Sequence, residues 1–387
     1  MKILFALVRT KVSGGVRYIF EVANGLADKG HDVKIVSLYG DHTWFRNLKA
    51  EVIYKPLKLN KFSVLTYNLY KIYRYLTLRS ARGSPYDTFL LISSALGVRP
   101  DSIVELAGLI RNFDADVTIA TYYLTAFSVW FSQNKNPFYL VQDFPELVKE
   151  YDGRLGLNVF FLSLRLPFSF VTVSSYAKQI ILENNPTAKV TLAHPGVNLN
   201  VFKPKRADGK SEGKEKVMVI LRGTKFKGDE IALKVLKNVN KKIPIHAVIV
   251  GGKSLVRHYA KTIGLDFEHS VFSNVSDEVL AELYSSSNAF LYTSYAESFG
   301  LPPLEAMACG TPVVMTDNKG SSDYAVDGFN ALISQPGDVK SLSDNLLKLL
   351  QCDKLRETLI ENGLNTAKKF TWERTVENFG NALKEIN

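Results

Sequence analysis

Residues 289–315, AFLYTSYAESFGLPPLEAMACGTPVVM, decide the fold class of this chain. A short apolar run, Ala289 to Tyr292, leads into a polar loop. Residues that favour a helix follow as far as Gly310, and a second apolar run begins at Pro312. Two strands joined through a helix form a βαβ unit, whose strands are parallel because the helix carries the chain back. The stretch therefore predicts an α/β protein built on parallel sheets.

The same alternation of short apolar runs and longer amphipathic stretches extends along the chain. The expected strands are Lys2 to Val8, Val33 to Leu38, Val117 to Ala120, Phe138 to Val141, Phe170 to Val173, Val217 to Leu221, His246 to Val250, Ala289 to Tyr292, Pro312 to Met315 and Ala331 to Ile333. Helical periods fit between them, for example over Asp277 to Ser286 and Ser341 to Gln351. Two such series predict two Rossmann-like domains that face each other across a cleft.

A polar segment separates the two series. Residues 204–216, PKRADGKSEGKEK, are rich in charge and contain glycine, as a linker or an exposed connection does. The boundary is expected near Pro195 to Lys205. We therefore expect an N-terminal domain over residues 1–200 and a C-terminal domain over residues 201–369.

The composition is that of a globular protein of 387 residues, with 46% hydrophobic and 22% charged residues. Its two cysteines, Cys309 and Cys352, cannot form a disulfide framework and lack a metal-ligand spacing, so a reducing, cytoplasmic setting is expected. The apolar run Ile3 to Val8 is followed by Arg9 and Lys11 without a small-residue cleavage site, and it is interpreted as a strand.

Positive charge is concentrated in the N-terminal half, where residues 1–190 carry +8 of the net +10. No acidic residue occurs within residues 52–86, where lysines and arginines alternate with tyrosines. Leu65, Leu69, Ile72 and Leu76 recur there at helical spacing. This favours either an amphipathic helix at an anionic membrane surface or an ordinary surface helix. Leu155 to Phe170 is a second membrane candidate. Nucleic acid is not expected as a partner, because the basic run adjoins no known binding motif.

The loop that follows Tyr292 is expected at the carboxyl end of a parallel sheet, where ligands bind in open α/β folds. Gly300 permits close approach of the backbone to a ligand, and the prolines at 302 and 303 suit the first positions of a helix. The positive N-terminal end of that helix favours phosphate oxygens. Glu305 is expected in its first turn. Glu297 and Glu305 can accept hydrogen bonds from vicinal hydroxyls, as on a ribose and a hexose; the alternative is a pair of solvated surface acids.

The segment Glu297 to Glu305 resembles the E-x7-E signature of the family 4 glycosyltransferases, which have the GT-B fold and retain anomeric configuration. The similarity covers nearly the whole chain and is strongest from Val217 to Leu383. Further matching segments are Ser13 to Val16, Val173 to Ser175, His194 to Asn198, Asp317 to Ile333 and Phe370 to Glu373. In this fold the last helix returns to the N-terminal domain, which implies that role for residues 370–387.

The resemblance implies roles for individual residues in a site for a UDP, GDP, ADP or dTDP sugar. Glu305 would bind the ribose hydroxyls and Glu297 the donor sugar, which the backbone of Phe299, Gly300 and Leu301 would orient. Arg222 and Lys227 would stabilise the diphosphate leaving group in place of a metal, so no cofactor is expected. Their alternative is a pair of solvated surface charges.

Gly14 and Gly15 would let a loop of the N-terminal domain approach the phosphates or the sugar. Their alternative is a tight turn without a ligand. Gln142 stands where many family members have a histidine, so no imidazole is available there to move a proton. A retaining reaction can use the departing phosphate oxygen as base instead. Asp143 is a candidate for holding the acceptor hydroxyl or for stabilising the oxocarbenium-like charge, with a helix or turn cap as its alternative.

Tyr122 and Tyr123 are acceptor-side candidates, although aromatic residues after a strand more often serve packing. Asp114-Ala-Asp116 has the D-x-D form of a metal-binding motif. It precedes a strand and so lies away from the carboxyl-end edge, and no metal is assigned.

The function expected is retaining hexosyl transfer from a nucleotide sugar to a glycan or lipid-linked acceptor. Two alternatives stay open: a nucleotide-sugar 2-epimerase of the same fold, and a non-catalytic homologue that serves as a partner subunit. A NAD-dependent oxidoreductase is disfavoured because no G-x-G-x-x-G follows the first strand.

Overall fold

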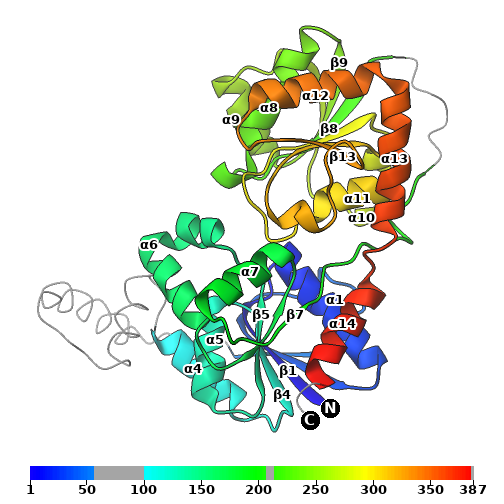
Figure 1. Cartoon of the computed structure of the whole chain (residues 1–387). Coiled ribbons are helices and arrows are strands. Elements are labelled where there is room, and N and C mark those ends of the chain that lie inside the picture. Colours follow the sequence, from blue (N-terminus) through cyan, green and yellow to red (C-terminus); the bar gives the residue numbers. More distant parts are fainter. Residues whose placement is uncertain (56–99, 206–212, 385–387) are drawn as a thin grey trace, which may run out of the picture. The chain divides into compact units, whose positions relative to one another are not determined.

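The computed structural model describes residues 1–55, 100–205 and 213–384 (Figure 1). The chain forms two compact units. Unit 1 contains Met1–Val173, Ala177–Ala193 and Val376–Asn387, and unit 2 contains Ser174–Tyr176 and His194–Thr375. Each unit is one parallel sheet with helices on its two faces, so the predicted α/β class with two Rossmann-like domains is confirmed.

Unit 1 has a seven-stranded parallel sheet in the order β3-β2-β1-β4-β5-β6-β7. Its strands are β1 (Lys2–Arg9), β2 (Asp32–Tyr39), β3 (Glu51–Tyr54), β4 (Val117–Ala120), β5 (Pro137–Val141), β6 (Ser169–Thr172) and β7 (Val190–Leu192). Its described helices are α1 (Gly14–Asp28), α4 (Pro100–Ile110), α5 (Tyr123–Ser132), α6 (Pro145–Ser163), most of α7 (Ser175–Asn184) and the end of α14 (Trp372–Lys384). The strand order reverses between β1 and β4, which pair in register at Phe5 and Ile119.

Unit 2 repeats this winding with six parallel strands in the order β10-β9-β8-β11-β12-β13. They are β8 (Glu215–Ile220), β9 (Ile245–Val250), β10 (Glu268–Phe272), β11 (Ala289–Tyr292), β12 (Val313–Thr316) and β13 (Ala331–Ser334). Its helices are α8 (Asp229–Asn240), α9 (Lys253–Thr262), α10 (Asp277–Ser285), α11 (Leu301–Ala308), α12 (Val339–Gln351) and α13 (Asp353–Ala367), with short 3₁₀ turns at Lys225–Lys227 and Gly320–Asp323. Here the order reverses between β8 and β11.

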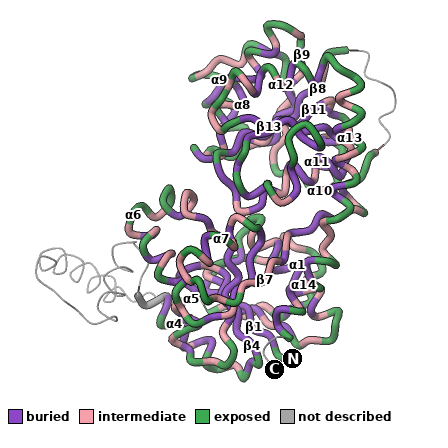
Figure 2. Tube along the Cα trace, in the orientation of Figure 1, coloured by how far each residue is buried: buried purple, intermediate pink, exposed green. Residues whose placement is uncertain are grey.

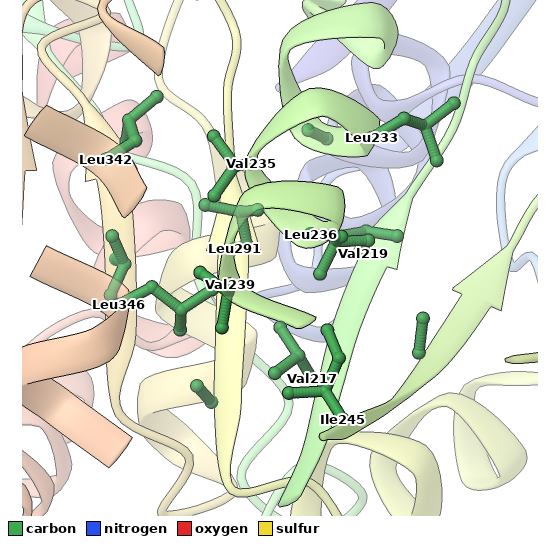
Figure 3. Close-up of a cluster of buried hydrophobic side chains, with 14 of the residues drawn as sticks. Val217, Val219, Leu233, Val235, Leu236, Val239, Ile245, Leu291, Leu342 and Leu346 are labelled. Atoms are coloured by element: carbon green, nitrogen blue, oxygen red, sulfur yellow. The ribbon is translucent and has the colours of Figure 1, made fainter. Parts of the chain in front are cut away.

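In the core of unit 2, side chains on one face of the sheet pack against side chains from the inward faces of the helices (Figure 3). Val217 and Val219 of β8, two residues apart, point to the same face of the sheet. Leu233 and Leu236 of α8, with Leu346 of α12, cover that face, and all five side chains are fully buried. This packing fixes the carboxyl ends of the central strands, where the site residues begin.

Three observed strands, β3, β7 and β10, are absent from the expected set. Each of them lies at a sheet edge, and none of its residues is fully buried. The buried residues gather toward the centre of each unit (Figure 2). An edge strand has a neighbour on one side only and keeps polar residues, so the apolar run that identifies a central strand is missing. The central strands, buried on both faces, are where the sequence predicted them.

The end of α14 packs on unit 1. The ring centroids of Phe379 and Phe5 are 6.0 Å apart. A Cβ atom at Gly25 of α1 would come within 2.3 Å of Val376, so only glycine allows the two helices to approach so closely. The last helix therefore begins in unit 2 and ends in the core of unit 1.

The two segments considered for membrane contact have different outcomes. Most of the basic stretch 52–86 lies outside the described residues; only its first four residues, in β3 and just after it, are described. The run Leu155 to Phe170 is divided between α6 and β6, and Val159, Phe160 and Leu164 are buried. Part of that apolar run therefore lies in the core of unit 1, whereas Leu162 is exposed. No helix in the described part of the chain is both long enough and apolar enough to span a bilayer.

Candidate functional site

The reversal of strand order in unit 2 brings together two loops far apart in the sequence. Because β8 pairs directly with β11, the loops that leave their carboxyl ends, 221–228 and 293–300, are neighbours. Gly228 lies so close to the second loop that a Cβ atom on it would be 2.1 Å from the Thr293 carbonyl oxygen. Its φ of 69° also favours glycine. Such a reversal point is where open α/β sheets bind ligands.

Glu297 is the centre of this contact. Its side chain is 9% exposed, and Lys227 Nζ lies 2.7 Å and 2.8 Å from its two carboxylate oxygens. The hydroxyls of Tyr292 and Ser294 also donate to Oε1, at 2.5 Å and 2.6 Å. Burial, with the nearby Glu297 charge, raises the pKa of Tyr292 well above its ordinary value, which keeps this hydroxyl a donor. The structure thus brings together two residues that the sequence assigned to donor binding and leaving-group stabilisation.

The loop between Glu297 and α11 is held by residues 318–324. Ser321 Oγ donates to the Phe299 carbonyl oxygen at 3.0 Å, and the Tyr324 hydroxyl donates to the Gly300 carbonyl oxygen. Gly300 has a φ of 82°, and a Cβ atom there would be 2.5 Å from Ser321 Oγ. The Glu297 amide donates to the Asn318 carbonyl oxygen at 3.0 Å. Sequence reasoning did not single out Ser321 or Tyr324, since no local pattern shows which loop a hydroxyl will reach.

Helix α11 begins at Leu301, with Gly300 as its N-cap. Pro302 and Pro303 are its second and third residues and carry no N–H, so the backbone donors at the start of this helix are the amides of Gly300 and Leu301. Glu305 is the fifth residue and lies in the second turn, so its expected place in the first turn was wrong. The helix starts one residue before the prolines because Gly300 supplies the left-handed cap.

The charges of Glu305 and Arg222 both influence the pKa of the buried Tyr284. The Tyr284 hydroxyl lies 3.5 Å from Glu305 Oε2. Burial raises the pKa of Tyr284 well above its ordinary value; the negative charge of Glu305 adds to this rise, and the positive charge of Arg222 opposes it. Arg222 is exposed. The second carboxylate of the E-x7-E segment and the candidate diphosphate cation therefore lie at the same end of the sheet.

Asp229, in the first turn of α8, supports the Arg222 loop, and sequence reasoning missed it. Its carboxylate accepts from the amide of Arg222 at 3.2 Å and 3.0 Å and from that of Gly223 at 2.7 Å. Asp229 is 2% exposed, and burial raises its pKa despite these hydrogen bonds. An aspartate at a helix start directly after a glycine was the available signal, because such residues commonly accept from loop amides.

In unit 1 the glycine pair and Gln142 meet at the start of α1. Gln142 Nε2 donates to the Gly15 carbonyl oxygen at 3.3 Å, and a Cβ atom on Gly15 would lie 3.3 Å from Gln142 Oε1. A Cβ atom on Gly14 would meet no atom within 4 Å, so open space lies beside it. Ser13 caps the helix by accepting from the Val16 amide at 3.2 Å.

Tyr122, Tyr123 and Asp143 gather beyond the ends of β4 and β5 together with Asp152, which the sequence did not single out. The hydroxyls of Tyr122 and Tyr123 both donate to Asp152 Oδ2, at 3.1 Å and 2.8 Å. Burial raises the pKa of Asp143 to about 7, with the charge of Asp152 adding to the shift. The two tyrosines therefore do more than pack, because both of their hydroxyls donate to one acidic side chain.

The D-x-D aspartates lie at the opposite edge of the sheet of unit 1. Asp114 Oδ2 pairs with Lys2 Nζ at 3.0 Å, and Asp116 Oδ2 accepts from the Lys2 amide at 2.7 Å. Both carboxylates thus serve the amino end of β1. Within residues 1–55, 100–205 and 213–384, no group of three or more His, Cys, Asp or Glu side chains is arranged to hold a metal ion.

The C-terminal part of the chain is similar to known proteins. Residues 201–366 match the family described as glycosyl transferases group 1. Over 110 residues the chain is 41% identical to O-antigen chain mannosyltransferase B of Escherichia coli, covering 28% of each protein. Over 218 residues it is 29% identical to D-inositol 3-phosphate glycosyltransferase of Mycolicibacterium smegmatis, covering 52% of this chain and 49% of that protein. The chain spans about half, or less, of the length of the curated relatives it matches.

Solved structures resemble the whole chain. Sucrose-phosphate synthase of Thermosynechococcus elongatus superposes with a TM-score of 0.75 at 18% identity, covering 100% of this chain and 99% of that one. HepE of Anabaena, in a complex with UDP and glucose, has a TM-score of 0.75 at 16% identity and covers 100% of both chains. At these identities the likeness concerns the fold, which is GT-B.

Proposed function

We propose that this protein transfers a hexosyl unit from a nucleotide-diphosphate sugar to a hydroxyl of a glycan or lipid-linked acceptor, because residues 201–366 match the family described as glycosyl transferases group 1. The reaction retains anomeric configuration and uses no metal. The observation that carries the proposal is the Lys227–Glu297 pair, a buried carboxylate and a cation at the strand-order reversal of unit 2.

The donor is held through the loop that joins Glu297 to α11. Glu297 contacts the hydroxyls of the donor sugar, and Glu305 accepts from the ribose hydroxyls. The amides of Gly300 and Leu301 at the helix N-terminus face the phosphates. The rigid hold of Ser321 and Tyr324 on this loop supports the assignment, since donors fixed in advance bind charge without the cost of ordering a flexible loop.

Arg222 and Lys227 stabilise the leaving group. The bond between the sugar C1 and the phosphate oxygen breaks with its electron pair passing to the diphosphate, and the fixed cations neutralise that charge. The acceptor oxygen forms its bond to C1 on the same face, and its proton passes to the departing phosphate oxygen. The hold of Asp229 on the Arg222 backbone supports a fixed position for the start of this loop.

Donor binding and product analysis together test the proposal. UDP, GDP, ADP and dTDP sugars are screened by thermal shift, and the best binder is titrated by calorimetry. UDP sugars come first, because HepE, which shares this fold, is known in complexes with UDP and UDP-glucose. We expect Arg222→Ala and Glu305→Ala to weaken binding at least tenfold. Glu361→Gln, which changes an exposed acid on α13, serves as the control.

Product analysis then separates transfer from the alternatives. Incubation with membrane lipid and oligosaccharide acceptors should yield a glycosylated product and the free nucleoside diphosphate. Conversion of the donor to its 2-epimer in the absence of any acceptor would show an epimerase instead. Unchanged donor binding in both alanine variants would support a non-catalytic homologue.

A further inference from the structure

Thr10, directly after β1, ties the ends of three strands together. It is fully buried, and its amide donates to the carbonyl oxygen of Tyr39, the last residue of β2, at 3.1 Å. Its carbonyl oxygen accepts from Trp44 Nε1 at 2.9 Å, and its hydroxyl lies 2.7 Å from that of Tyr54, the last residue of β3. A Cβ atom on Gly40 would be 2.3 Å from Thr10 Oγ1, so only glycine lets the loop after β2 pass so close. This junction lies at the carboxyl edge of the unit 1 sheet, where ligands bind in open α/β folds.

His42, in the loop after β2, is held by this junction. Its Nδ1 atom lies 3.0 Å from the Tyr54 hydroxyl, and the two rings stack with their centroids 5.8 Å apart. The neighbouring Asp41 is engaged in its own turn, because its carboxylate accepts from the amide and the hydroxyl of Thr43, both at 2.9 Å. The His42 ring is partly exposed, and its Nε2 atom has no hydrogen-bond partner among the described residues. A fixed ring nitrogen is thus open to a ligand.

Burial decides whether that nitrogen carries a proton. The Thr10 hydroxyl is buried, and in the described part of the chain the Tyr54 hydroxyl is its hydrogen-bond partner, so the Thr10 proton is donated to Tyr54. Tyr54 then donates its single proton to His42 Nδ1. A neutral imidazole that accepts at Nδ1 carries its own proton on Nε2. The open nitrogen is therefore a donor, and its ligand must supply an acceptor oxygen.

The charges beside the junction are positive. Arg9 and Lys11 flank Thr10 in the sequence, and Lys55 follows Tyr54 directly. All three basic side chains are exposed, and none of them forms an ion pair in the part of the chain that the structure describes. Unpaired cations beside a fixed N–H donor favour an oxyanion over a neutral hydroxyl, because hydrogen bonds to a charged acceptor are stronger than those to a neutral one.

We propose that the junction is a phosphate-binding subsite for the acceptor, in which His42 Nε2 donates to a phosphate oxygen and Arg9 and Lys55 supply the opposite charge. Thr10 and Tyr54 are positioning residues, because they act through His42. This inference rests on the proposed glycosyl transfer and names the class of its acceptor, a molecule that carries a phosphate ester. A soluble sugar phosphate and a lipid-linked phosphate share this chemistry.

The first experiment observes the His42 ring directly. The full chain carrying ¹⁵N-labelled histidine is studied by NMR at a pH where the ring is neutral, with His42→Phe identifying its signals. We expect the form protonated at Nε2 in the wild type. Tyr54→Phe removes the donor to Nδ1 and should give a mixture of the two neutral forms. A wild-type ring protonated at Nδ1, or no change in Tyr54→Phe, would contradict the role of the junction.

Ligands are then added to the same sample. Inorganic phosphate, glucose 1-phosphate and farnesyl phosphate are titrated, with methyl α-glucoside as the neutral comparison. We expect the His42 signals to move with the three phosphates and to stay in place with the neutral sugar. A tighter response to glucose 1-phosphate assigns a soluble acceptor, and a tighter response to farnesyl phosphate assigns a lipid-linked one. If no phosphate moves these signals, the inference fails.

A pair of lysine variants tests the charge. Lys55→Met should weaken the response of His42 to phosphate by roughly threefold, as expected for the loss of one exposed charge. Lys29→Met removes an exposed charge at the end of α1, near the amino edge of the same sheet, and should leave the response unchanged. Equal effects in the two variants would mean that phosphate responds to the overall charge of the protein and not to this site.

The second experiment measures transfer from the donor that binds, with phosphorylated and neutral forms of one acceptor sugar. His42→Phe keeps a ring beside Tyr54 and should raise the KM of the phosphorylated acceptor by roughly tenfold or more, the effect of losing one hydrogen bond to a charged group. Calorimetric donor binding should not change. His42→Gln, whose side-chain amide can donate in place of Nε2, should recover part of the loss. His258→Phe, which removes an exposed histidine on α9, is the matched control.

The outcomes separate this inference from the proposed function. If no nucleotide sugar binds the wild type, the proposed function fails, whatever the phosphate titration shows. If a sugar is transferred, but the phosphorylated and neutral acceptors have the same KM in the wild type and in His42→Phe, this inference alone fails. An effect of His42→Phe on the neutral acceptor alone would also overturn it, because the junction would then bind the sugar and not a phosphate.

Discussion

Lys227 Nζ lies within 2.8 Å of both carboxylate oxygens of Glu297, although 70 residues separate the two in the sequence. The pair lies where β8 and β11 end, and Tyr292 and Ser294 complete the set of donors around Glu297. A buried carboxylate with three such donors is well compensated. In the proposed reaction, a diphosphate that binds here interacts with Lys227, whose charge already neutralises Glu297.

Removal of the cation should therefore affect catalysis strongly. We expect Lys227→Met to lower kcat by roughly 10²-fold or more, because a fixed positive charge is lost where negative charge develops. Lys225→Met, which removes an exposed charge two residues away on the same 3₁₀ turn, should stay within twofold of the wild type. Steady-state kinetics with the identified donor decide the matter. If kcat falls equally in the two variants, the loss is due to overall surface charge and not to the position of Lys227.

Gly300 is expected to tolerate no side chain. Gly300→Ala combines a φ of 82° with a Cβ atom 2.5 Å from Ser321 Oγ, and should lower the free energy of unfolding by about 1–3 kcal/mol. Gly328→Ala has a similar φ of 69° with no atom within 4 Å, so it isolates the backbone strain. Urea unfolding of Gly300→Ala with and without Ser321→Ala measures the steric part. No recovery in the double variant would show that the clash is relieved in another way.

Asp229 should matter both for stability and for donor binding. Asp229→Ala leaves the amides of Arg222 and Gly223 without their acceptor, at a cost of about 1.5–3 kcal/mol in the free energy of unfolding. The donor KM should rise as the Arg222 loop loses its support. The neighbouring exposed acid gives a matched control, Glu230→Ala, which should change neither quantity appreciably. Steady-state kinetics and denaturant unfolding measure the two effects. If the KM of a destabilised Asp229→Ala variant is unchanged, Asp229 serves folding alone.

Asp143 gives a stability prediction with a definite sign. Burial raises its pKa to about 7, above the ordinary 3.8, so the folded protein binds more protons than the unfolded chain between these values. Its contribution to stability is full below pH 4 and is lost as pH rises through 7. Asp143→Asn should therefore gain stability relative to the wild type as pH rises from 4 to 8. Each unit of raised pKa corresponds to about 1.4 kcal/mol.

A second aspartate with the opposite shift serves as the control for that measurement. Hydrogen bonding to Lys2 holds the pKa of exposed Asp114 below its ordinary value. Its contribution is present above the unfolded pKa and is lost as pH falls through the folded one. Unfolding by urea should show the stability difference from the wild type rising with pH between 4 and 8 for Asp143→Asn, and falling with rising pH below 4 for Asp114→Asn. Two slopes of the same sign would contradict the assignment of a raised pKa to Asp143.

Much of the fold and part of the site could be predicted because their signals are local. Apolar runs marked the central strands, which are buried on both faces, whereas the edge strands β3, β7 and β10 lacked such runs. The segment Glu297 to Glu305 was recognisable because a strand end, a permissive glycine and a helix start follow one another directly. Glu305 was placed one turn too early, since the prolines mark the beginning of a helix only to within a residue or two.

What the sequence by itself determined is the α/β class with parallel sheets, and the side chains available at the ends of the strands. Only the tertiary structure decided which of them meet. Lys227 reaches Glu297 because β8 pairs with β11, although β9 and β10 lie between these two strands in the sequence. Asp152 reaches Tyr122 and Tyr123 because α6 breaks at Gly153. Such partners are set by strand order and helix direction, for which a local run of residues carries no signal.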